Sequence, residues 1–452
     1  MRYIFTVYSM QILVVKKLGC GEVTIVKQKA NAVVMFNGLT GLTPRKVIEM
    51  KLELKIVDLK RTISLVIRMI YFALHFIATI FINRGLTTNL KGEYAYIINI
   101  VSVLAIIGGM GLDLLFLEFT KKYGKKVLGT FLGLTYIYAG MFFILSIISQ
   151  CRFHNQELFW ILLLTSAHVL YANISTFACV KDIASRNIIL LIIQIVYICF
   201  LAWAYFNDYG NLNYILFLYL LNDVLVSLIL VIKNKYHVRW SLLEIGVNHI
   251  TVLKKITHLG IKAMLISLLI AFNYNLDIIM LKKMGISLEL IGIYSVAVTL
   301  SNIVLLIPDA FKELVLGIVV CDNAAHKIKK YLQINVVFLI IIAIGFCIFG
   351  KWFINCFYGS AYITSYQVTL ILFIGDLFIC IYKVIHPLLI ADGKQTTVLK
   401  YLIIAVMINF IMNIILIPIF NIFGAALASV GSYFVTGVLF YIHFQNNYLK
   451  VK

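Results

Sequence analysis

Four residues of the first apolar segment could bind an anionic group. Arg68, Tyr71, His75 and Thr79 are spaced by three, four and four residues, so they share one stripe of a helix. Ionisable groups inside a membrane are costly and are functional candidates by default. A guanidinium offers a planar fork that matches phosphate oxygens. We predict that Arg68 and His75 line an aqueous lumen and bind phosphate. The alternatives are snorkelling of Arg68 to the interface and a packing role for His75.

A second group of cations lies in the C-terminal half. Lys383 and His386 are one helical turn apart in the tenth apolar segment, and Lys312 lies in the eighth. We interpret all three as substrate-binding residues that face the same lumen as Arg68. Two alternatives stay open: Lys312 pairs with Asp309, three residues before it, and Lys383 snorkels to the interface.

Acidic residues in these segments are candidates for ion coupling. Asp277 follows Asn273 by one turn in the seventh segment, and Asp376 lies in the tenth. A carboxylate inside a helical bundle can exchange protons or pair with moving cations, and an inter-helix hydrogen bond or ion pair is the alternative. His168 and Asp223 are polar points of the fourth and sixth segments, which we interpret as inter-helix hydrogen bonds.

The elements that position these residues are twelve apolar segments of about 20 residues. Hydrophobic residues make up 62% of the chain and charged residues 13%, with a mean hydropathy of +0.99. Each segment can span a hydrocarbon core of about 30 Å, and none alternates in polarity as a barrel strand would. We therefore predict an all-α integral membrane protein with about 12 transmembrane helices. The expected spans are 62–83, 94–117, 127–149, 157–180, 188–206, 214–232, 263–281, 290–318, 329–349, 364–390, 398–420 and 423–445.

The two halves of the chain repeat each other at a spacing of about 200 residues, as is typical of transporters. The repeat predicts two pseudo-symmetric six-helix lobes, at 62–232 and 262–446, joined by a cytoplasmic linker at 233–261. Pro308 is expected to hinge or break the eighth helix. The matching residues are Gly85-Leu86-Thr87 with Gly285-Ile286-Ser287, Leu90, Gly92 and Tyr94 with Leu290, Gly292 and Tyr294, and Asp113 with Glu313.

The net charge of +20 is a topology signal. Lysine and arginine concentrate in the even-numbered loops, for example at Lys125 and Lys233, and are few in the odd-numbered loops. The positive-inside rule therefore places both termini in the cytoplasm, and this distribution argues against nucleic-acid binding. Residues 1–61 form a cytoplasmic segment and 447–452 a cytoplasmic tail. We interpret residues 1–49 as a disordered extension or the product of a start codon placed too far upstream; an extra domain is less favoured, because so short a segment supports little core.

From about residue 62 onward, the chain resembles the multidrug/oligosaccharidyl-lipid/polysaccharide exporter superfamily, and within it the bacterial O-antigen and capsule repeat-unit flippases. The resemblance implies a V-shaped, two-lobed transporter that alternates access in the cytoplasmic (inner) membrane. It implies undecaprenyl-pyrophosphate-linked oligosaccharide as substrate, with membrane lipids, a polysaccharide polymerase and a chain-length regulator as partners. It rests on Gly92-Glu93-Tyr94-Ala95-Tyr96, Leu276–Leu281, Ile291–Ala297, Tyr358–Tyr362, Ala391–Lys394, Leu416–Ala426 and Ser432-Tyr433.

Other function classes are weighed against this one. The chain has no GxxxxGK(S/T) or HExxH motif and no thiolate cluster, so we expect no ATP hydrolysis, catalytic residues, metal site or cofactor. A drug/cation antiporter of the same fold is the main alternative and should have an acidic, aromatic cavity. A membrane polysaccharide polymerase should carry a large outward loop, whereas these loops are short. A lipid-linked peptidoglycan precursor is a further possible substrate.

The charge distribution makes the orientation testable by labelling single cysteines in intact cells. Cysteines at Asn211 and Ser360 should react with an impermeant thiol reagent from outside, because both lie in odd-numbered loops. A cysteine at Lys125 should react only after permeabilisation. Labelling of position 125 in intact cells would overturn the predicted orientation.

Overall fold

The computed structural model describes residues 66–237, 249–309, 311, 315 and 324–449. This part of the chain contains 12 helices long and apolar enough to cross a membrane, which confirms the predicted all-α membrane fold. The N-terminal group comprises the first span (Val66–Gly85), α2 (Thr88–Gly109), α3 (Leu112–Tyr123), α4 (Leu128–Phe153), α5 (Gln156–Lys181), α6 (Ile183–Phe206) and α7 (Leu212–Asn234). The C-terminal group comprises α8 (His249–Lys283), α9 (Leu288–Val304), α11 (Ala324–Phe357), α12 (Ser365–Ala391), α13 (Gln395–Phe420) and α14 (Ile422–Phe444).

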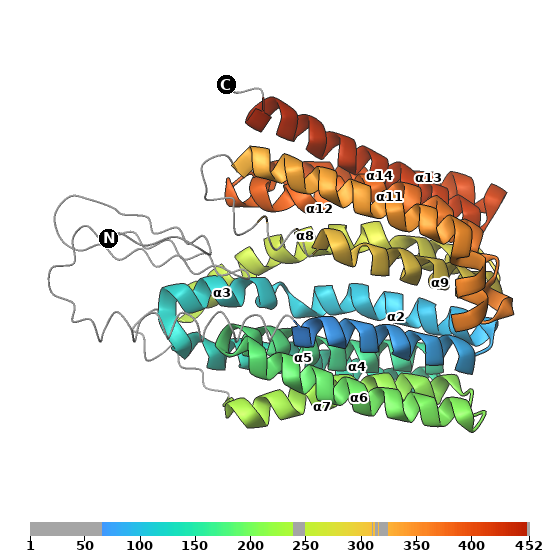
Figure 1. The fold of residues 1–452 in the computed structure, drawn as a ribbon. Coiled ribbons are helices and arrows are strands. Elements are labelled where there is room, and N and C mark those ends of the chain that lie inside the picture. Colours follow the sequence, from blue (N-terminus) through green and yellow to red (C-terminus); the bar gives the residue numbers. More distant parts are fainter. Residues whose placement is uncertain (1–65, 238–248, 310, 312–314, 316–323, 450–452) are drawn as a thin grey trace, which may run out of the picture.

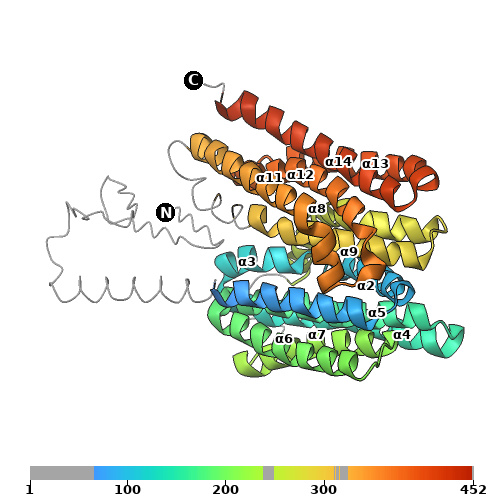
Figure 2. The same cartoon turned by 45° about the vertical axis from the view of Figure 1, so that its right-hand side comes forward.

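The two groups form two lobes with α8 and α9 lying between them (Figure 1). The helices run roughly parallel, so the bundle has two ends, which Figure 2 shows from a second direction. The end with the short turns around His154, Gly210 and Gly285 is called the short-loop face below. The opposite end, where Lys181 and Lys394 lie, is called the basic face.

Equivalent side chains begin equivalent helices in the two lobes. The Thr87 hydroxyl accepts a hydrogen bond from the Leu90 N–H (3.4 Å) at the start of α2. The Ser287 hydroxyl accepts one from the Leu290 N–H (3.4 Å) at the start of α9. Hydroxyl side chains at this position satisfy N–H groups that the first turn of a helix leaves without partners. The sequence repeat is thus also a repeat of helix starts.

The second and eighth spans both break before they reach the basic face. α2 ends at Gly109, and the next two residues, Met110 (φ 49°) and Gly111 (φ 65°), are left-handed. α9 ends at Val304, four residues before Pro308, whose ring clashes with the carbonyl at that position. The sequence predicted one span at 94–117, which was wrong because a left-handed pair turns the chain into the separate helix α3. For the span at 290–318 it predicted a hinge or break at Pro308, and the structure has an interruption at Leu305, after which residues 306–309 are helical again.

The lobes meet at a crossing of α2 and α9 near the short-loop face. A Cβ atom on Gly92 would lie 1.8 Å from the Leu288 carbonyl oxygen, and one on Gly292 would lie 2.2 Å from that of Thr88. Only glycine allows two helix backbones to approach this closely. Because Gly92 matches Gly292 in the sequence repeat, the crossing lies on the pseudo-symmetry axis.

Two cations join the lobes around this crossing. Arg84 donates from Nη2 to the Cys356 carbonyl (2.6 Å) and from Nε to the Phe357 carbonyl (3.1 Å). Lys282 pairs with Glu157 at 2.8 Å. Each cation ends the first helix of one lobe and reaches the third or fourth span of the other. We call these two contacts the latches, and they hold the short-loop face together.

α8 belongs to both lobes. Near its start, Ile256 is buried in the N-terminal core with Leu112 and Phe116. A Cβ atom on Gly260 would lie 2.5 Å from the Met110 carbonyl oxygen, so the lobes also touch toward the basic face. Farther along, α8 packs against the C-terminal helices. The helix begins within the segment 233–261 that the sequence analysis assigned to a linker; residues 238–248 of that segment lie outside the described part.

Gly92→Ala should disrupt the assembly of the lobes. Its methyl group has no space against the Leu288 carbonyl, so we expect a loss of about 1–3 kcal/mol or more of stability from overpacking. Gly140→Ala in α4 is the matched control, because nothing lies within 4 Å of the added atom. Melting temperature and monodisperse yield in detergent measure both. An unchanged Gly92→Ala protein would contradict the close crossing.

Candidate functional site

The predicted polar stripe of the first span lies inside the N-terminal lobe. Tyr71 is hydrogen-bonded to Tyr171 of α5, and its ring stacks on His75 at 6.3 Å. The His75 side chain is exposed in the structure, and its ring lies on the same side of the first span as Tyr71. Arg68 is half-buried, with its guanidinium 5.5 Å from the centre of the Phe72 ring.

Lys383 makes an ion pair inside the C-terminal lobe. Its Nζ lies 2.8 Å from Oδ2 of Asp309, and its side chain is 12% exposed, whereas that of Asp309 is 46% exposed. The ammonium also lies 5.7 Å from the centre of the Tyr274 ring. The Lys383 side chain is thus largely buried and has an acidic partner. Asp309 lies just past the break of α9, so the pair marks the broken span.

The remaining predicted cations have separate positions. The His386 ring packs against Tyr382 at 5.1 Å, one turn from Lys383 on α12. Lys312 lies outside the described residues, so its proposed pairing with Asp309 stays a prediction. Arg68 and Lys383 come from opposite lobes.

Asp277 lies in a buried polar cluster of the C-terminal lobe. Its carboxylate accepts hydrogen bonds from the Tyr294 hydroxyl (2.8 Å), the Asn413 amide (2.8 Å) and the Ser429 hydroxyl. The Asn413 amide also donates to Asn409 Oδ1 (2.9 Å). These donors come from α9, α13 and α14 and converge on α8. We call Asp277, Asn409, Asn413 and Ser429 the Asp277 cluster.

The Asp277 cluster could hold a hard cation or a proton. It supplies one carboxylate, two amide oxygens and one hydroxyl oxygen, and oxygen ligands suit such cations. Asn413 Oδ1 and Asn409 Nδ2 are buried and have no hydrogen-bond partner among the described residues. Asn409 Oδ1 already points toward Asn413, so rotation of the Asn413 amide alone would turn a second carbonyl oxygen toward an ion in the cluster. No group of three His, Cys, Asp or Glu side chains in the described part of the chain could hold a metal.

Asp376 has a simpler environment. Its carboxylate is buried and accepts from the Ser301 hydroxyl at 2.9 and 3.0 Å. Ser301 belongs to the last turn of α9, so this contact joins α12 to the broken span. Asp376 also lies about two turns from Lys383 on the same helix.

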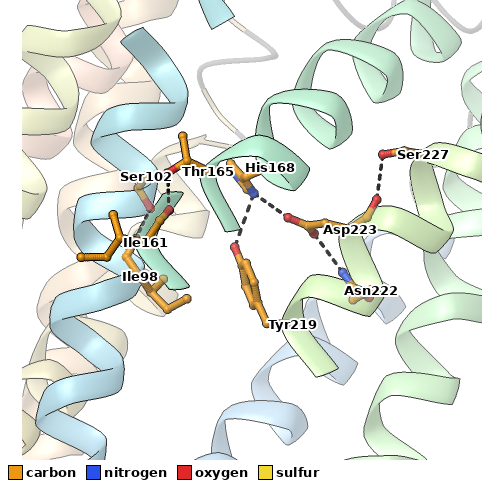
Figure 3. A network of polar contacts seen from close by, with 9 residues as sticks. All are labelled: Ile98, Ser102, Ile161, Thr165, His168, Tyr219, Asn222, Asp223 and Ser227. Atoms are coloured by element: carbon orange, nitrogen blue, oxygen red, sulfur yellow. Dashed lines mark hydrogen bonds and ion pairs between the residues drawn. The ribbon is translucent and has the colours of Figure 1, made fainter. Parts of the chain in front are cut away.

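The structure changes one interpretation of the N-terminal lobe and confirms another. Lys91 lies between the expected spans 62–83 and 94–117, but it is buried in the first turns of α2, 4.9 Å from the centre of the Tyr94 ring. His168 and Asp223, interpreted from the sequence as inter-helix hydrogen bonds, contact each other at 2.8 Å between α5 and α7 (Figure 3). Their positions near the middle of α5 and α7 were the available signal.

The break after α2 also carries an acidic residue. Asp113 lies in the first turn of α3, where burial raises the pKa of its carboxyl, although hydrogen bonds from the Leu114 and Asp113 N–H groups oppose the effect. Its repeat partner, Glu313, lies outside the described residues. Interrupted spans at corresponding positions of two repeats are the usual sign of a binding region in transporters.

Solved transporter structures share this arrangement. The lipid II flippase MurJ in an inward closed conformation matches with a TM-score of 0.63 and 14% identity, over 83% of this chain and 87% of that chain. An inward-facing multidrug resistance MATE family transporter of the MOP superfamily matches with a TM-score of 0.60 and 12% identity, over 82% and 93%. A mutant of the Vibrio cholerae MATE transporter VcmN matches with a TM-score of 0.58 and 12% identity, over 85% and 93%. The chain has the fold of these transporters.

Sequence comparison adds little to this fold. No family model matches the chain. An uncharacterized membrane protein of Methanocaldococcus jannaschii is 29% identical over 126 residues, which cover 28% of this chain and 25% of that protein. The chain thus matches about a quarter of the length of this relative.

Asp277→Asn should remove a response to cations. In the wild type, replacing choline by Na⁺ at constant ionic strength should raise the melting temperature, because a ligand at 100 times its Kd contributes about 2.7 kcal/mol. The variant should not respond, and unsatisfied donors should cost it about 1–3 kcal/mol. Asp182→Asn is the charge-matched control, since asparagine also caps α6. Equal Na⁺ responses in all three proteins would exclude a cation at Asp277.

Proposed function

We propose that this protein translocates polyprenyl-pyrophosphate-linked oligosaccharides, the repeat units of O-antigen or capsular polysaccharide, across the bacterial cytoplasmic membrane. The head group would pass between the lobes while the polyprenyl chain stays in lipid. The shared fold with a lipid II flippase supports translocation of a lipid. The observation that carries the proposal for an anionic substrate is the Lys383–Asp309 pair at the break of α9.

The two members of this pair differ in exposure. Lys383 is largely buried, so its ammonium needs an anionic partner. Asp309 is nearly half exposed and can return to water at low cost. A diphosphate brings more negative charge than one carboxylate and can therefore replace Asp309 on Lys383. Lys383 can thus exchange the Asp309 carboxylate for an anionic ligand.

Other residues support the same conclusion. Arg68 in the N-terminal lobe supplies a second cation, and His75 lies on the same stripe of the first span. The buried acids of the C-terminal lobe are occupied by hydroxyl and amide donors, as a site for a large organic cation would not be. We further propose that the basic face lies in the cytoplasm, where substrate is loaded, and that a polymerase and a chain-length regulator act on the released product.

Lys383→Ala should weaken binding of a fluorescent polyprenyl pyrophosphate in nanodiscs. Loss of one charge-assisted hydrogen bond of about 1.5–3 kcal/mol corresponds to a roughly 10- to 150-fold higher Kd. Lys383→Arg should bind nearly as well, and Asp309→Asn should bind at least as tightly, because the competing carboxylate is gone. Lys400→Ala, at an exposed lysine of α13, is the control.

The same variants in vesicles test translocation. Wild-type protein should make the labelled lipid accessible to an impermeant quencher on the opposite side, and Lys383→Ala should not. Equal Kd values for wild type and Lys383→Ala would remove this residue from the site. Transport of a lipophilic cation, without binding of the pyrophosphate lipid, would favour the drug/cation antiporter instead.

A further inference from the structure

The His168–Asp223 pair lies near the middle of the N-terminal lobe. His168 follows the start of α5 at the short-loop face by 12 residues and Asp223 follows that of α7 by 11, which places them about 16–18 Å into the bundle. The pair joins α5 to α7 (Figure 3), and its side chains are 25% and 4% exposed, respectively. A charged pair at this depth is costly, so its retention needs a reason.

The imidazole provides the main charge compensation for Asp223. Oδ2 of Asp223 contacts His168 Nδ1 at 2.8 Å, and Oδ1 accepts from the Asn222 amide at 3.2 Å. Ser227 donates to the backbone carbonyl of Asp223 and not to the carboxylate. Among the described residues, no lysine or arginine forms an ion pair with Asp223.

The groups around the pair are mostly neutral hydroxyls. The Tyr219 hydroxyl lies 3.4 Å from the same His168 nitrogen, and the Tyr171 ring lies 5.5 Å from the imidazole. Tyr71 of the first span is hydrogen-bonded to Tyr171, and its ring stacks on His75 at 6.3 Å, so a second imidazole lies on this side of the lobe. α4 carries a single charged residue, Arg152, in its last turn at the short-loop face.

A cation of α6 has hydrogen-bond partners other than Asp223. Arg186 of α6 donates to the Ser175 hydroxyl (2.9 Å) and to Asn187 Oδ1 (3.0 Å), about two turns along α5 from His168. Its charge is permanent, whereas that of an imidazole is not. A proton on His168 is therefore an adjustable charge that lies directly against Asp223.

The corresponding place in the other lobe has different chemistry. Asp376 follows the start of α12 by about 12 residues and thus lies at the depth of the pair. Its partner is the Ser301 hydroxyl, which cannot take up a proton at neutral pH. The N-terminal lobe has a base at this depth, and the C-terminal lobe has a hydroxyl. The pseudo-symmetry of the helices does not extend to these side chains.

We infer that His168 and Asp223 form a proton-binding site of the N-terminal lobe, separate from the Asp277 cluster. With a proton, the pair is an imidazolium and a carboxylate with no net charge. Without it, the pair carries a net charge of −1. Resting on the proposed function, this inference couples proton uptake to entry of the anionic head group, because the protonated pair does not repel a diphosphate. Transport should then fall as the pH rises and the pair loses its proton.

Histidine-selective ¹⁵N NMR tests the site without any substrate, with His168→Gln assigning the signal. The His168 signal should change with pH, because an imidazole takes up and releases a proton in the physiological pH range. In Asp223→Asn the proton should leave at lower pH, because the carboxylate no longer stabilises the imidazolium. A His168 that does not titrate, or an unchanged titration in Asp223→Asn, would overturn the inference.

A pH profile of lipid translocation separates proton coupling from a structural role. Wild-type rates should fall about tenfold per pH unit above the titration midpoint, whereas His168→Gln should give a flat profile. His326→Gln, at an exposed position on α11, should keep the wild-type profile. Equal slopes for wild type and His168→Gln would contradict proton coupling. Titration of His168 in a protein that translocates no pyrophosphate lipid would refute the proposed substrate and support the proton site.

Discussion

The crossing of α2 and α9 is the contact on which the two-lobed structure depends. At Gly92 and Gly292 the two backbones touch, with Leu288 and Thr88 carbonyls occupying the space that side chains would fill. Hydrophobic attraction does not hold helices together in lipid, so close packing has to do so. Because the crossing is symmetric, it also sets the distance between Arg84 and Lys282 and their partners in the opposite lobe. The latches follow from the crossing and are not independent of it.

Both lobes contain acidic side chains that have partners within the protein, and the partner of each carboxylate determines its chemistry. Asp277 and Asp376 are surrounded by hydroxyl and amide groups, which stabilise a carboxylate without adding charge. Asp223 is paired with an imidazole and Asp309 with an ammonium. The scaffold therefore places four carboxylates in four different environments: Asp277 among hydroxyl and amide groups, Asp376 against a hydroxyl, Asp223 against an imidazole and Asp309 against an ammonium. Duplication of the helices has not duplicated the chemistry.

Much of the fold could be predicted from the sequence. Uninterrupted apolar length identifies membrane spans, and the match of Gly92 with Gly292 was visible before their contact was known. The interruptions after α2 and α9 were harder to predict. Pro308 has a defined effect on the residue four positions earlier, but the left-handed turn at Met110 and Gly111 depends on the close approach of Gly260 from another lobe.

The site was less predictable, since pairing is a three-dimensional property. Lys383 and Asp309 are 74 residues apart, and His168 and Asp223 are 55 apart. Spacing along one helix identifies which side chains share a face, but not which helix that face meets. The sequence therefore identified ionisable positions on single helices. It could not show that Lys383 and His168 each have an acidic partner, which changes their chemistry.

The position of the glycine crossing has a mechanical consequence. Gly92 lies in the second turn of α2, so about 17 residues, or about 25 Å, of that helix extend from it toward the basic face. If the lobes rock about this point as a lever, a rotation of about 10° moves the far end by about 4 Å, nearly one helical turn. Such a displacement is enough to part Gly111 from Gly260. Residues close to the fulcrum, including both latches, would move little. A small angular change can thus open one end of the bundle while the other end remains shut.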